Sequence, residues 1–282
     1  MDYQDTREGG ALHTRSYLEQ IGVGELPRRT SPFDPGYDPV TLASHLEQSA
    51  HLMSALKISM ACWMVADEAS TRGKVAAARA HEVPTVTGGG AFEVAVAQDR
   101  LSAYLDLCAD IGVARIEAGE GFTEPNLRPS AVVAQANRRG LEVQFELGKK
   151  HGGAFTTDMV ATLIGEGHRW LDGGAMQLVI EARESACGVG LFDERGRFQP
   201  RYADRFADAF GLSLVLFEAP NKASQFALLG HFGRDVALCN VRLEELLRVE
   251  IYRRGLHADA FDNPRLRPPR VGAQEGTQKE RP

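Results

Sequence analysis

Short apolar runs alternate with longer segments of helical period along most of the chain. The apolar runs, which predict buried strands, fall at residues 32–33, 56–59, 83–87, 114–118, 141–147, 176–180, 212–217 and 236–239. The segments of helical period fall at 39–51, 67–81, 92–111, 129–139, 157–171, 200–210, 222–232 and 242–255. Eight successive strand–helix units predict an α/β fold, the single-domain TIM (β/α)8 barrel. A doubly wound open sheet also alternates, but its glycine-rich phosphate turn does not follow the first apolar run.

The two ends of the chain differ from this repeating middle. Residues 1–28 are polar apart from a short amphipathic stretch, and we interpret them as an N-terminal extension. Residues 262–282 are rich in proline and arginine and almost devoid of apolar side chains, which predicts a disordered C-terminal tail. The barrel is therefore expected to occupy residues 29–261.

Composition and charge narrow the class of partner. The chain has 282 residues, 43% of them hydrophobic, and a formal net charge of -6, so we expect no basic surface that attracts nucleic acid or anionic lipid. The longest apolar runs are far shorter than a membrane helix, and the polar N-terminus is unlike a signal peptide, so we expect a cytoplasmic protein. Small-molecule substrates are the expected partners, and a homo-oligomer formed through barrel helices is compatible with the pattern.

Glutamates directly follow several of the predicted strands. Glu146, Glu181 and Glu218 stand at the ends of the fifth, sixth and seventh apolar runs, and the fourth run leads into Glu117 and Glu120. In a TIM barrel these positions converge at one mouth, where the carboxylates would repel one another unless cations offset them. Oxygen ligands beside lysines and arginines predict a site for Mg²⁺ and an anionic, phosphorylated substrate. A single strand-end glutamate can equally close a salt bridge with the next loop.

Other loop residues carry weaker signals. The run of glycines at residues 88–90 allows backbone amides to approach an anion, but it is equally typical of a flexible turn. Residues 188–193 indicate a structured lid after the sixth strand, with glycines that supply backbone freedom and Phe192 as an anchor. His151 is a candidate either for catalysis or for a structural hydrogen bond.

Three ordered segments identify a resemblance. Glu-Leu-Gly-Lys-Lys stands at 146–150, Ile-Glu-Ala-Arg-Glu-Ser at 180–185 and Phe-Glu-Ala-Pro-Asn-Lys at 217–222. Together with Lys57 and with Phe92-Glu93 after the glycine run, they resemble the phosphosulfolactate synthase family, which includes plant heat-stress-associated relatives. The resemblance covers about residues 28–261. It implies a Mg²⁺-dependent TIM-barrel lyase that adds sulfite to C3 of phosphoenolpyruvate to give (2R)-3-phosphosulfolactate, a step towards coenzyme M in methanogens.

The resemblance also implies residue roles. Lys149 is assigned as the general acid that protonates C2, with Lys150 as the competing choice and Glu181 as a further catalytic residue. Burial or a nearby metal would bring the pKa of such a lysine towards neutrality. The candidate metal ligands are Glu146, Glu181 and Glu218. The candidate substrate-binding residues are Lys57, Gly89, Gly90, Arg183, Glu184, Ser185, Asn221, Lys222 and Asn240.

The chain departs from the family pattern in several places, including two segments. Residues 59–63 read Ser-Met-Ala-Cys-Trp where the family usually has Gly-Trp-Gly-Thr-Ser, and residues 119–122 read Gly-Glu-Gly-Phe where Ser-Asp-Gly-Ser is usual. The lost hydroxyl groups predict a more apolar pocket around Cys62, Trp63 and Phe122. Two alternatives therefore stay open: a different nucleophile added to a phosphoenolpyruvate-type substrate in specialised metabolism, or a non-catalytic, stress-associated barrel.

Overall fold

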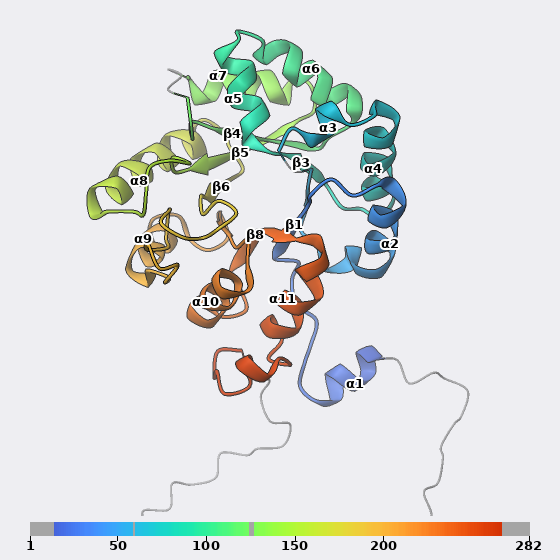
Figure 1. Ribbon diagram of the computed structural model, residues 1–282, viewed down its shortest axis with the longest axis vertical. Coiled ribbons are helices and arrows are strands. Elements are labelled where there is room, and N and C mark those ends of the chain that lie inside the picture. Colours follow the sequence, from blue (N-terminus) through green and yellow to red (C-terminus); the bar gives the residue numbers. More distant parts are fainter. Residues whose placement is uncertain (1–13, 59, 124–126, 267–282) are drawn as a thin grey trace, which may run out of the picture.

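The eight predicted strands close into one parallel barrel. The computed structural model describes residues 14–58, 60–123 and 127–266, and its strands follow one another around the barrel in chain order, with β1 completing the circle against β8 (Figure 1). Their bounds are β1 Thr30–Asp34, β2 Leu56–Ile58, β3 Thr85–Thr87, β4 Arg115–Gly119, β5 Glu142–Leu147, β6 Gln177–Ile180, β7 Val215–Glu218 and β8 Ala237–Arg242. The predicted single-domain TIM barrel is confirmed.

The helices form a ring outside the barrel (Figure 1). The principal ones are α2 Pro39–Ser49, α4 Glu68–Ala80, α5 Gly89–Ala97, α6 Leu101–Ile111, α7 Pro129–Asn137, α8 Thr157–Asp172, α9 Pro200–Phe210, α10 Lys222–Phe232 and α11 Leu246–Arg253. Two shorter helices, α1 Thr14–Gln20 and α3 Cys62–Val65, precede β1 and follow β2. The single helix predicted over 92–111 is two helices, α5 and α6, because the chain turns between them at Asp99, which has a φ of 53°.

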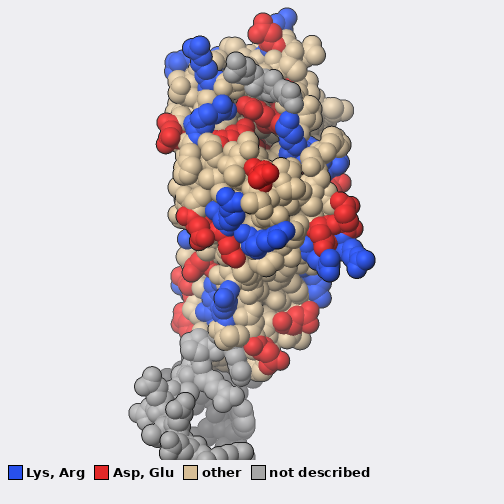
Figure 2. All heavy atoms as spheres, turned by 90° about the vertical axis from the view of Figure 1, so that its left-hand side faces the viewer, with Lys and Arg blue, Asp and Glu red and all other residues tan. Residues whose placement is uncertain are grey.

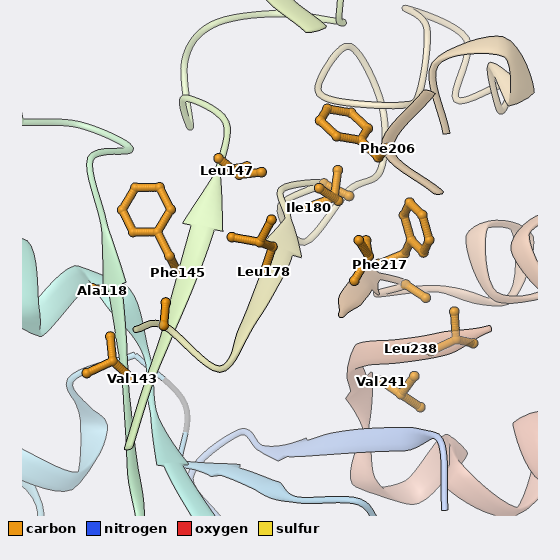
Figure 3. Packing of buried hydrophobic residues seen from close by; sticks show 14 of the residues in the cluster. Ala118, Val143, Phe145, Leu147, Leu178, Ile180, Phe206, Phe217, Leu238 and Val241 are labelled. Carbon is orange, nitrogen blue, oxygen red and sulfur yellow. The ribbon is translucent and has the colours of Figure 1, made fainter. Parts of the chain in front are cut away.

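Alternate residues of each strand pack outward against the helices. Figure 3 shows this outer layer for β4 to β8, where Phe145 and Leu147 of β5 lie beside Leu178 and Ile180 of β6. The ring of Phe145 stacks on Trp170 of α8 with 4.1 Å between ring centroids. These side chains are almost completely buried, so the outer layer supplies much of the apolar burial that stabilises the fold.

The intervening residues point into the barrel, and many of them are polar. Gln144 donates a hydrogen bond to Glu117 and accepts others from Arg115 and Gln177, so four neighbouring positions are linked across β4, β5 and β6. Because side chains alternate along a strand, the next inward residue of β5 after Gln144 is Glu146, at the carboxyl end. The inward and outward alternation of side chains along β5 therefore places the Glu146 carboxylate at the mouth of the barrel.

The described chain continues past residue 261, where the tail was expected to begin. Leu266 is fully buried in the main apolar cluster, and its carbonyl oxygen accepts a hydrogen bond from Arg234. Asn263 donates to the carbonyl oxygen of Gly230 at the end of α10. Residues 262–266 thus pack on the barrel, while the rest of the predicted tail lies outside the described residues.

The surface charges are mixed in sign. On the face shown in Figure 2, lysines and arginines alternate with aspartates and glutamates over the described residues. Among the described residues, none of the helices is both long enough and apolar enough to cross a lipid bilayer.

Candidate active site

A large cavity opens at the carboxyl ends of the strands. Its volume is about 1530 Å³. Most of the residues predicted from sequence line it: Lys57, Gly89, Gly90, Glu146, Lys150, Glu181, Arg183, Glu184, Ser185, Glu218 and Asn240. The fold therefore brings together residues from β2, β5, β7 and β8, from the start of α5 and from the loops after β5 and β6, as the site of a TIM barrel requires.

One side of the charged floor is a buried ion pair. The ammonium of Lys57 lies 2.7 Å from Oε1 of Glu117 and 3.9 Å from Oε1 of Glu218. Burial alone raises the pKa of the Glu117 carboxyl, but the Lys57 ammonium and the amide of Gln144 outweigh it and hold the pKa below its ordinary value. The backbone N–H of Gly89, at the start of α5, donates to the same carboxylate at 3.0 Å. Glu117 is therefore a fixed negative charge with several donors.

The other side is organised around Lys150. Its ammonium donates to Oε1 of Glu146 at 2.7 Å and to Oε2 of Glu181 at 2.8 Å. Burial lowers the pKa of Lys150, but these two carboxylates outweigh it and raise the pKa above its usual range. Burial, followed by repulsion from Glu181, raises the pKa of Glu146 well above its ordinary value. The expectation of a lysine pKa lowered towards neutrality is therefore wrong for Lys150, whose ammonium the two carboxylates keep charged.

Glu218 fixes the backbone that follows β6. Its Oε2 accepts hydrogen bonds from the backbone N–H groups of Ala182 at 2.8 Å and Arg183 at 3.0 Å. Its Oε1 accepts a hydrogen bond from the side-chain amide of Asn240. Asn240 has a φ of 53°, and its Oδ1 is buried without a hydrogen-bond partner among the described residues. Such a strained residue with an unused acceptor is typical of a ligand-binding position.

The charge balance of the floor suits a divalent cation. Among the described residues that line the cavity, Glu117, Glu146, Glu181 and Glu218 are buried carboxylates that face two ammonium groups, those of Lys57 and Lys150. If all four were ionised, they would outnumber the two ammonium groups by two negative charges, and carboxylate oxygens are the ligands that Mg²⁺ prefers. In the described part of the chain, lysines link the carboxylates, and three potential ligands do not converge on one point. The ligand types present are those that Mg²⁺ prefers, but the described carboxylates do not form a ligand set of three, so Mg²⁺ and its direct ligands stay a prediction.

Three predicted site residues lie away from the cavity. Lys149 is exposed, and its charge acts on Glu166 of α8. Lys222 forms an ion pair with Asp259 at 3.2 Å. Asn221 caps the start of α10 and donates to the carbonyl oxygen of Ser185 at 2.9 Å. Of the two candidate lysines, only Lys150 is among the described residues that line the cavity.

The loop after β6 is folded over the neighbouring loop. The backbone N–H of Phe155 donates to the carbonyl oxygen of Gly190 at 2.7 Å, and Phe192 is buried. Gly190 has a φ of 57°, and a Cβ at this position would lie 2.0 Å from the carbonyl oxygen of Glu181. Only glycine fits there, so the glycines of residues 188–193 permit this close approach. His151 is exposed, with Nδ1 3.4 Å from the guanidinium of Arg183.

The apolar wall of the cavity is not where the sequence indicated. Trp63 is buried against Tyr104, 6.4 Å between ring centroids, and neither Cys62 nor Phe122 lines the cavity. Ser59 lies outside the described residues. The wall is formed by Met60, which precedes α3, Met64 of α3, Val94 of α5 and Leu107 of α6. The expectation of an apolar pocket around Cys62, Trp63 and Phe122 is therefore wrong in its residues.

Two glutamates have roles that the strand-end pattern did not assign. The strand-end pattern assigns Glu117 no role of its own. Because Arg115 and Glu117 are two residues apart on β4, both side chains point into the barrel, and Glu117 is buried there. Glu93 of α5 is completely buried, and its carboxylate accepts from the backbone N–H groups of Gly121 (3.0 Å), Phe122 and Thr123 (both 2.9 Å). It thereby holds the loop after β4, whose Gly121 carbonyl accepts from the backbone N–H of Lys150.

Comparisons with known proteins agree on one family. The family model of (2R)-phospho-3-sulfolactate synthase (ComA) matches residues 27–259. The phosphosulfolactate synthase of Methanocaldococcus jannaschii is 29% identical over 236 residues, which cover 82% of this chain and 93% of that protein. That of Methanothermobacter thermautotrophicus is 27% identical, with 84% and 92% covered.

Solved structures share the architecture at much lower identity. Deoxyribose phosphate aldolase from Aeropyrum pernix gives a TM-score of 0.51 at 12% identity, covering 80% of this chain and 90% of that one. A putative deoxyribose-phosphate aldolase from Toxoplasma gondii gives 0.50 at 11% identity, covering 84% and 95%. At such identities these likenesses show the fold alone.

Proposed function

This chain belongs to the (2R)-phospho-3-sulfolactate synthase family, and from that premise we propose that it is a lyase that joins a sulfur nucleophile to C3 of phosphoenolpyruvate, with sulfite as the reference nucleophile and Mg²⁺ as cofactor. The observation that carries the proposal is the position of Lys150, an ammonium held between Glu146 and Glu181 inside the cavity. Such a group can give a proton to carbon once the nucleophile has attacked.

The reaction separates into one bond-forming step and one proton transfer. The sulfur lone pair forms the S–C3 bond, and the π electrons of C2=C3 move onto C2 and the adjoining carboxylate. When bound, Mg²⁺ supplies positive charge to that enolate-like carboxylate. Lys150 then donates a proton to C2, and the phosphate stays on the C2 oxygen throughout.

Neighbouring residues bind and orient the anionic substrate. Arg183 lines the cavity, and its guanidinium donates to the carbonyl oxygen of Lys150 at 3.2 Å, so it stands next to the proposed acid. An arginine offers two parallel donors to a phosphate or carboxylate. The ammonium of Lys57 adds a buried positive charge on the opposite side of the floor, and the Oδ1 of Asn240 offers an acceptor.

Phosphorus NMR tests the proposal directly. Purified protein is incubated with phosphoenolpyruvate and Mg²⁺, with and without sulfite, and with EDTA in a parallel sample. We expect a new phosphate-ester resonance that requires both sulfite and Mg²⁺. Loss of phosphoenolpyruvate without a new ester, or an unchanged spectrum in the complete mixture, contradicts the proposed reaction.

A further inference from the structure

The cavity extends well beyond the charged floor. One wall consists of Met60, Met64, Val94 and Leu107, which we call the apolar shelf. Their exposed fractions are 52%, 48%, 54% and 36%. Large apolar side chains that gather at such exposure mark a surface that is covered by a ligand or a partner when the protein works.

Phosphoenolpyruvate and sulfite do not account for this wall. Both are small, strongly hydrated anions that are stabilised by cations and hydrogen-bond donors, and neither gains free energy from contact with methionine or valine side chains. A volume of about 1530 Å³ also exceeds the roughly 300–1,000 Å³ of typical ligand pockets. The apolar shelf therefore needs an apolar group.

The shelf is connected to the reaction centre through α5. This helix starts at Gly89, whose N–H contacts Glu117 on the charged floor, and Val94 lies five residues further along the same helix. Five residues of α-helix advance about 7.5 Å, the length of one small ring or a short alkyl chain. A group attached to the nucleophile can thus reach the shelf while its reactive atom stays at the floor.

We propose that the apolar shelf binds the organic substituent of an organic sulfinate, R–SO₂⁻, which replaces sulfite as the nucleophile. The inference rests on the proposed function. The sulfur lone pair forms the S–C3 bond, the π pair moves onto C2 and its carboxylate, and C2 takes a proton from Lys150, which solvent reprotonates. The product is a sulfone that keeps its phosphate ester, so the step needs no oxidant or reductant.

Substrate comparison with the wild-type protein is the first test. Phosphoenolpyruvate consumption and the new phosphate ester are measured with Mg²⁺ and either sulfite, methanesulfinate or benzenesulfinate. We expect kcat/KM for benzenesulfinate to exceed that for methanesulfinate at least about tenfold, because only the larger group reaches the shelf. Equal values for the two sulfinates, together with normal turnover of sulfite, overturn this inference and leave the proposed function intact. Absence of turnover with all three nucleophiles removes both.

A matched pair of variants locates the preference. Val94→Asn places an amide on the shelf and is expected to lower the benzenesulfinate-to-sulfite ratio of kcat/KM about tenfold. Val40→Asn changes an exposed valine of α2 outside the cavity and should alter neither rate. Sedimentation is followed for the same variants. The proposal is overturned if Val94→Asn leaves the benzenesulfinate-to-sulfite ratio of kcat/KM unchanged but sediments with a lower molecular mass than the wild type. That result would show that a second copy of the chain covers the apolar shelf.

Discussion

The two sides of the charged floor use the same residue types with opposite effects. Glu117 faces the Lys57 ammonium, the Gly89 N–H and the Gln144 amide, and its pKa lies below the ordinary value. Glu146 has the Lys150 ammonium, but it also faces Glu181, and burial raises its pKa far above that value. Both carboxylates are completely buried, so the difference comes from the number of donors and the proximity of a like charge.

The contrast separates positioning from chemistry. A carboxylate with a full set of donors stays ionised and fixes the geometry around it, as Glu117 does for Lys57. A group of carboxyls that share too few cations exchanges protons readily and can respond when substrate or metal binds. The β5–β7 side, with Lys150 at its centre, is therefore where we expect proton transfer, and the β2–β4 side is where we expect a rigid support.

Lys150→Met should produce the largest effect. Removing the proposed proton donor is expected to lower kcat by about 10³-fold, because general acids contribute 10²–10⁴-fold. Lys149→Met is the matched variant and should keep kcat within about twofold, since Lys149 does not line the cavity. Both are measured by phosphoenolpyruvate consumption with sulfite. A severe loss in Lys149→Met with a mild one in Lys150→Met would reverse the assignment.

Glu117→Gln should have the largest effect on stability. It leaves the Lys57 ammonium buried without its nearest counter-charge, which is expected to cost about 3 kcal/mol in free energy of unfolding. Because the pKa of Glu117 is lowered in the folded protein, its contribution is present above the unfolded value of about 4.5 and is lost as pH falls through the folded pKa. Urea unfolding at pH 7 and pH 4 measures both. A variant as stable as the wild type at pH 7 would contradict the rigid-support role.

Glu93→Gln tests whether the buried Glu93 carboxylate of α5 positions Lys150 through the loop after β4. The amide can accept fewer of the backbone N–H groups that Glu93 now binds, so we expect a loss of about 2 kcal/mol in stability. Because Gly121 also holds the backbone of Lys150, kcat should fall about tenfold as well. Thermal unfolding and initial rates are the measurements. A loss of stability with unchanged kcat would confine Glu93 to a structural role.

The sequence predicted the barrel and most of the floor because both follow from strand periodicity. Glu146 and Glu218 lie inside their strands and Glu181 directly follows β6, so their positions at the mouth were fixed once the barrel was recognised. Lys149 and Lys150 are adjacent in a loop, and only the folded backbone decides which one points inward. The apolar shelf escaped prediction because its side chains come from α3, α5, α6 and the loop before α3, whose packing the local pattern does not determine.

Glu146→Gln should have the smallest effect on the free energy of unfolding. Unlike Glu117→Gln and Glu93→Gln, it is expected to raise that free energy at high pH. The raised pKa means that protonation of this carboxyl stabilises the folded protein; that contribution is fully present below the unfolded value of about 4.5 and is lost as pH rises through the folded pKa. The neutral amide avoids that loss, so the variant should be about 1 kcal/mol more stable than the wild type at pH 8 and should lose this advantage near pH 4. Urea unfolding at the two pH values measures the difference. A variant that is less stable at pH 8 would mean that Glu146 is an ionised partner of Lys150, as Glu117 is of Lys57, and the contrast between the two sides would disappear.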